Sequence, residues 1–123
     1  MKDLLFWLYM ANAIVLITHE IDSAYWKEWE LFRLPGGPGG FLLLHVPMLL
    51  LILYGLVLVY TESLAGLVIS LVLCGGGLFA FSIHTVFLKK GDGRFDAPVS
   101  KLLLRLTLLI SLTQAGVTIY ILV

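Results

Sequence analysis

The chain has 123 residues, of which 60% are hydrophobic and 13% charged, and its eight basic and eight acidic side chains give a formal net charge of zero. This length fits one domain, and the apolar content excludes a soluble globular protein and favours an integral protein of the lipid bilayer. The sequence has no Lys/Arg-rich run and no nucleic-acid motif, so we expect no nucleic-acid partner.

Four apolar runs are long enough, or nearly so, to cross a bilayer as helices, which takes about 20 residues each. They predict an all-α fold: a single transmembrane domain over residues 1–123, built as a four-helix bundle with helices at about 4–21, 41–60, 64–88 and 100–123. The first run resembles a secretory signal. Because only about seven apolar residues precede Ala11, we expect it to be a retained first span.

The first span ends in a cluster of ionisable and aromatic residues at positions 18–30, which holds four of the eight acidic side chains. A straight helix through this cluster would be too long for the bilayer. We therefore expect the chain to bend after His19 and to lay residues 22–34 along the membrane interface as an amphipathic segment. The glycine- and proline-rich residues 35–40 are expected to form a loop, with the next helix starting after it.

Basic residues are distributed unevenly between the two ends of the predicted bundle. Seven of the eight lie at the end formed by residues 22–34 and 89–105, and only Lys2 lies at the end that holds both termini. This asymmetry follows the positive-inside rule. It predicts a multi-pass protein of the cell (inner or plasma) membrane with both termini on the non-cytoplasmic side.

All three histidines are predicted to lie near the cytoplasmic edge of the bundle. With antiparallel spans, His19 ends the first helix, His45 lies about one turn into the second, and His84 about one turn before the end of the third. Asp22 follows His19 by three residues and shares its helix face. His19, His45, His84 and Asp22 are therefore candidate ligands of a divalent metal such as zinc or iron.

An acid/base site without a metal is the alternative chemistry. A histidine beside a carboxylate in a low-dielectric pocket can exchange protons near neutral pH. The candidate catalytic residues in this interpretation are His19, Glu20, Asp22 and Glu28. The pattern leaves open which of the two chemistries applies, and whether the protein is an enzyme.

A second set of polar residues recurs at helical spacing and is predicted to face the interior of the bundle. On the last helix it includes Ser111 and Gln114, and on the first helix Asn12 lies two turns below the histidine layer. Interhelical hydrogen bonds explain such a stripe in lipid. The alternative is a cavity for an amphipathic substrate, with Asn12, Gly77, Arg105, Ser111 and Gln114 as its lining.

Three consecutive glycines, Gly75, Gly76 and Gly77, fall in the middle of the third span. Small residues allow helices in lipid to approach closely, so these glycines predict a tight helix crossing or a homo-oligomer interface. A ligand lying against the bare backbone is the other interpretation.

The run His19-Glu20-Ile21-Asp22-Ser23, followed by Glu28-Trp29 and by the Phe41-Leu42-Leu43-Leu44-His45 segment, resembles a family of small uncharacterised bacterial four-helix membrane proteins with a His-x-x-Asp and Glu-Trp signature. More loosely it is similar to HXXEE-type membrane proteins, although Asp22 and Ser23 stand where that pattern has paired glutamates. The resemblance implies the architecture and the candidate residues His19, Asp22, Glu28 and His45, and it implies no reaction.

These observations predict a small membrane protein with a His/carboxylate site at the cytoplasmic membrane edge, metal-binding or acid/base, that acts on or binds a lipophilic small molecule. Two alternatives lack catalysis. One is an oligomeric transport or binding module. The other is a structural subunit of a membrane complex that docks through the aromatic residues at positions 25–32.

Overall fold

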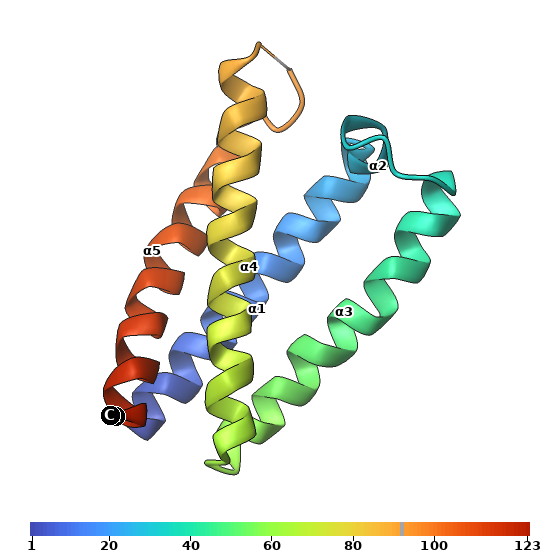
Figure 1. The fold of residues 1–123 in the computed structure, drawn as a ribbon. Helices are drawn as coiled ribbons and strands as arrows, with labels where there is room; N and C mark the ends of the chain where they lie inside the picture. Colours follow the sequence, from blue (N-terminus) through green and yellow to red (C-terminus); the bar gives the residue numbers. More distant parts are fainter. Residues whose placement is uncertain (92) are drawn as a thin grey trace.

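The computed structural model describes residues 1–91 and 93–123 and shows four long antiparallel helices with one short helix between the first two (Figure 1). The helices are α1 (Lys2–Tyr25), α2 (Glu28–Leu31), α3 (Gly37–Tyr60), α4 (Leu64–Lys89) and α5 (Pro98–Leu122). No strand occurs among the described residues. The predicted all-α four-helix bundle is therefore confirmed.

Helices α1, α3, α4 and α5 are each long and apolar enough to cross a membrane, which makes the chain a small multi-pass membrane protein. The four helices are not equally covered by protein. In the most apolar stretch of α1, α4 and α5, 33% of the residues are buried, whereas in α3 only 11% are. Helix α3 is thus the peripheral helix, and it diverges from α4 toward the end of the bundle that carries α2 (Figure 1).

The opposite ends of α3 and α4 are held together by a tight turn at residues 61–63. The Ser63 hydroxyl accepts a hydrogen bond of 3.0 Å from the backbone N–H of Gly66 and so caps the first turn of α4. A side chain at Gly66 would collide with the backbone of Leu58 on α3. Glycine here lets the two helix backbones touch, so α3 can diverge only toward its other end.

A buried polar network joins α1, α4 and α5. Asn12 donates hydrogen bonds of 3.0 Å to Ser111 Oγ and to Gln114 Oε1, and it accepts one of 3.1 Å from Thr107. Gln114 in turn donates to Ser70 Oγ at 2.9 Å. Hydrogen bonds between helices explain this stripe, as the first of the two interpretations predicts.

The substrate cavity predicted along this stripe stays a prediction. None of Asn12, Gly77, Ser111 or Gln114 lines the cavity between α1, α3 and α4 that is described below, and their polar atoms and bare backbone pack α1, α4 and α5 against one another. Arg105 is exposed on α5 and does not line that cavity either.

The bend predicted after His19 lies two turns later. Helix α1 runs without interruption to Tyr25, and the chain turns at Lys27, which has a left-handed φ of 54°. The Asp22 carboxylate accepts a hydrogen bond of 3.0 Å from Trp26 Nε1 one turn further on, and this contact supports the last turn of α1. The segment after the turn folds back as α2 instead of continuing into water.

The glycine-rich run at residues 35–40 is partly helical, which corrects the expectation of a loop up to residue 40. Helix α3 begins at Gly37, and Gly36 caps it with a left-handed φ of 93°. Pro38 falls in the first turn, where its missing N–H costs no hydrogen bond.

Candidate functional site

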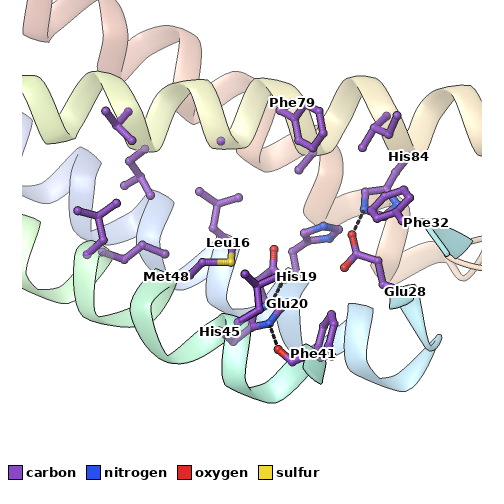
Figure 2. A pocket seen from close by; sticks show the side chains of 18 of the residues that line it. Leu16, His19, Glu20, Glu28, Phe32, Phe41, His45, Met48, Phe79 and His84 are labelled. Atoms are coloured by element: carbon purple, nitrogen blue, oxygen red, sulfur yellow. Dashed lines mark hydrogen bonds and ion pairs between the residues drawn. The ribbon is translucent and has the colours of Figure 1, made fainter. Parts of the chain in front are cut away.

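A cavity of about 300 Å³ lies between α1, α3 and α4 near the end of the bundle that α2 covers. Most of its wall is aliphatic or aromatic, and its ionisable lining gathers around α2, where α1, α3 and α4 contribute to one cluster (Figure 2). This cluster, which we call the polar end, consists of His19, Glu20, Glu28, His45 and His84.

The exposure of lining residues on α3 and α4 indicates that the cavity opens sideways between these two helices. Two of its lining residues on these helices, Leu44 and Phe79, are 50% and 65% exposed. Both belong to helices that cross the membrane, so the exposed side chains face the region that lipid fills. The entrance thus leads to the bilayer.

Tyr9 closes the cavity at the end opposite to the polar cluster. Its hydroxyl donates a hydrogen bond of 2.7 Å to the backbone carbonyl of Ile52, which links α1 to α3. A side chain at Gly55 would collide with the Tyr9 hydroxyl, so glycine at this position makes the contact between the helices possible.

Glu20 and His45 form the closest pair at the polar end. His45 Nε2 lies 2.5 Å from Glu20 Oε2, and His45 Nδ1 lies 2.7 Å from the backbone carbonyl of Phe41 (Figure 2). A carbonyl only accepts, so Nδ1 carries a hydrogen. One further proton must lie between Nε2 and the carboxyl group, and whichever of the two holds it, the pair has no net charge.

Glu28 and His84 form a second, looser pair, and the ring of His19 packs against that of His84. Glu28 Oε1 lies 3.4 Å from His84 Nε2, and the rings of His19 and His84 meet edge to face with centroids 4.7 Å apart. Burial raises the pKa of Glu28, but the interactions of the carboxylate with His84, Ser23 and His19 together outweigh burial, so this pKa lies below its ordinary value. Glu28 is therefore ionised at neutral pH.

The imidazole rings of His19 and His84 each have one nitrogen without a hydrogen-bond partner. His19 and His84 are each only 1% exposed, and the Nδ1 atom of each is buried without a hydrogen-bond partner in the described part of the chain. Buried polar atoms are nearly always paired in folded proteins. The Nδ1 atoms of His19 and His84 are therefore exceptions to this rule.

Phenylalanine side chains pack around these rings, and one of them, Phe95, was not singled out by the sequence pattern. Phe95, in the turn between α4 and α5, is 1% exposed and its ring centroid lies 4.2 Å from that of His84. Phe32 packs on the same imidazole at 5.8 Å. Phe95 has a left-handed φ of 64°, and no periodicity in a short polar turn could have indicated that its ring is buried.

The structure brings together most of the residues predicted for the site. All three histidines, Glu20 and Glu28 line the same cavity. Asp22 does not line it, because its carboxylate is turned toward Trp26 at the end of α1.

The three consecutive glycines of α4 have different surroundings. Gly76 lines the cavity, and a side chain added there would meet no neighbouring atom within 4 Å. Gly75 is also free of neighbours but lies outside the cavity. Gly77 is packed against the hydroxyl groups of Ser111 and Thr107 on α5.

The geometry combines a proton-holding pair, one carboxylate charge and an apolar chamber. In residues 1–91 and 93–123, no group of three or more His, Cys, Asp and Glu side chains is placed so that it could hold a metal ion. The arrangement can exchange protons at Glu20 and His45, and it can accept hydrogen bonds at the two free imidazole nitrogens.

Comparisons with known proteins place the chain in one family. No curated protein and no solved structure matches it. The sequence profile of a family of unknown function matches residues 5–121, nearly the whole chain. This agrees with the expected uncharacterised family, whereas the looser resemblance to HXXEE-type proteins and the bacterial origin stay predictions. The chain belongs to the family of unknown function DUF6713.

Proposed function

We propose that this protein binds a lipophilic small molecule that enters from the bilayer, and that the Glu20–His45 pair serves as a proton donor and acceptor toward it. The observation that carries the proposal is the cavity itself. Its entrance lies between two membrane-spanning helices, its wall is apolar, and its ionisable groups are confined to one end. Pockets for small molecules have this composition: a mostly apolar wall with few, well-placed polar groups.

The predicted cytoplasmic position of the polar end extends this proposal. It rests on the excess of Lys and Arg at this end of the bundle. Labelling an added cysteine after Val123 from one side of sealed vesicles tests it, since access from the cytoplasmic side would reverse the predicted orientation.

Gly76 offers a way to fill the cavity without disturbing the bundle. Because nothing lies within 4 Å of an added Cβ there, Gly76→Leu should place its side chain in the cavity. Gly75→Leu is the matched control. It adds the same side chain to the preceding residue of the same helix, also in open space, but outside the cavity.

The experiment measures saturable binding of three tritiated single-chain probes, dodecanol, dodecylamine and dodecanoate, to the full chain in phosphatidylcholine nanodiscs. The proposal expects at least one probe to bind saturably to the wild type and to Gly75→Leu, and to lose that binding in Gly76→Leu. If no probe binds saturably, or if both variants lose binding equally, the proposed function is wrong.

Metal binding and homo-oligomerisation are separate proposals that come from the sequence. Elemental analysis tests the first: stoichiometric zinc or iron that disappears in His45→Ala would support it, and unchanged metal content would remove His45 from the site. Native mass spectrometry tests the second, since an oligomer that assembles through the exposed Gly75 should dissociate in Gly75→Leu.

A further inference from the structure

The charge of the cavity wall narrows the class of molecule that it can take. Two glutamates and three histidines line the cavity, and no Lys or Arg does so in the described part of the chain. A fatty acid or a phospholipid headgroup would therefore meet carboxylates and no cation. In a site removed from water, an anion without a partner is strongly disfavoured.

The hydrogen-bond geometry distinguishes the two carboxylates at the polar end. The Glu20–His45 pair is neutral, because it shares a single proton between the carboxyl group and Nε2. His19 and His84 each have a buried Nδ1 without a hydrogen-bond partner. Among the described residues that line the cavity, Glu28 is the carboxylate that does not share a proton with a histidine at short hydrogen-bond distance.

The neighbours of the Glu28 carboxylate include the His84 ring and the Ser23 hydroxyl, and none of the cavity-lining residues in the described part of the chain is Lys or Arg. The 3.4 Å contact between Glu28 and His84 is longer than the 2.7–2.9 Å typical of charge-assisted hydrogen bonds. Because His84 Nε2 faces this carboxylate, the ring hydrogen belongs on Nε2 and the buried Nδ1 presents a lone pair. The polar end thus offers a carboxylate and an unpartnered acceptor, and it lacks a cationic donor.

We infer that the occupant of this cavity is a lipophilic amine, bound as its ammonium ion with the charged group at Glu28 and the chain along the apolar wall. An ammonium group supplies one positive charge and three N–H donors for a primary amine, which matches the carboxylate and the free imidazole nitrogens. Phenylalanine rings at the same end, among them Phe32 and Phe41, add the faces that attract a cation. This inference rests on the proposed function, since it assumes that the cavity takes a ligand from the bilayer.

The three probes share one chain and differ only in the head group, so their ranking tests the inference. Dodecylamine should bind at least about tenfold more tightly than dodecanol, and dodecanoate should bind most weakly, because an ionic hydrogen bond contributes more than a neutral one. If dodecanol or dodecanoate binds as tightly as dodecylamine and Gly76→Leu removes that binding, the amine inference is wrong while the proposed function stands. If none binds saturably, the proposed function itself fails.

Two variants on α2 test whether the ammonium group binds at the Glu28 carboxylate. Glu28→Gln should weaken dodecylamine about tenfold or more and leave dodecanol within about twofold, because only the charge is removed. Glu30→Gln is the matched control: Glu30 lies outside the cavity, has a side chain 51% exposed and pairs with Arg94. Retained dodecanol binding in Glu28→Gln shows that the site is still folded. Equal loss of both probes, or no loss of dodecylamine, would overturn the assignment of Glu28.

Discussion

Two polar clusters lie two turns apart on α1 and differ in how completely their hydrogen bonds are made. The Asn12 cluster uses both hydrogens and the oxygen of the Asn12 amide, and its partners on α5 and α4 complete one another. The His19 cluster leaves two imidazole nitrogens unpartnered and faces a cavity. Both are buried in a bundle that spans the membrane, where an unmade hydrogen bond is costly. The first cluster therefore stabilises the fold, and the second is the one for which we propose a bound molecule.

Among the substitutions that test this comparison, one at Asn12 should have the largest effect on stability. Asn12→Leu removes one hydrogen-bond partner from each of Ser111, Gln114 and Thr107, and the free energy of unfolding should fall by about 3 kcal/mol. Equilibrium unfolding in mixed detergent micelles measures it. The control is Thr18→Val, whose hydroxyl bonds only to a carbonyl of its own helix and is exposed. If Asn12→Leu costs no more than this control, the network does not hold the helices together.

A smaller loss of stability is expected where α4 meets α5. Gly77→Val forces a branched side chain against the Ser111 and Thr107 hydroxyls, and overpacking of this kind costs about 2 kcal/mol. Gly75→Val inserts the same side chain into open space on the same helix and should leave the stability nearly unchanged. Thermal unfolding of the two variants, compared side by side, checks the difference. Equal melting temperatures would mean that the α4–α5 contact is looser than the structure shows.

The smallest expected effect is a pH dependence at the polar end. Because the pKa of Glu28 is lower in the folded protein than its ordinary value of 4.5, the contribution of its charge is fully present above pH 4.5 and is lost as the pH falls through the folded value. Helix α2 should then loosen. Trp29, whose ring lies 5.3 Å from that of Phe41, reports this by fluorescence when Trp7 and Trp26 are replaced by Phe. The acid transition should be absent in Glu28→Gln, and its persistence there would assign it to another group.

The sequence predicted the four spans and the end of the bundle at which the three histidines lie, because apolar run length and antiparallel order determine both. It could not predict where α1 ends. The pattern is compatible with a bend after His19 or after Tyr25, and the choice depends on local contacts such as the hydrogen bond from Trp26 to Asp22. That choice decides which carboxylate enters the cavity: Glu28 folds back into it and Asp22 does not.

The polar stripe on α5 shows a different limit of sequence reasoning. Recurrent Ser, Thr and Gln at helical spacing indicate a face that points inward, but a cavity and a hydrogen-bonded contact both produce that pattern. Only the distances between Asn12 and its partners decide for the contact. The burial of Phe95 had no signal at all, since it depends on how one turn folds over His84.

The hydrogen bond between Tyr9 and the Ile52 carbonyl limits how far the cavity extends along α3. His45 lies at the polar end and Ile52 at the closed end of the same helix, seven residues apart, which corresponds to about 10 Å along α3. The rest of a longer chain has to leave sideways between α3 and α4, where it would mix with the lipid tails. The enclosed part of the cavity would therefore contact only the first segment of a bound molecule. Molecules that differ only beyond that segment should bind with similar affinity.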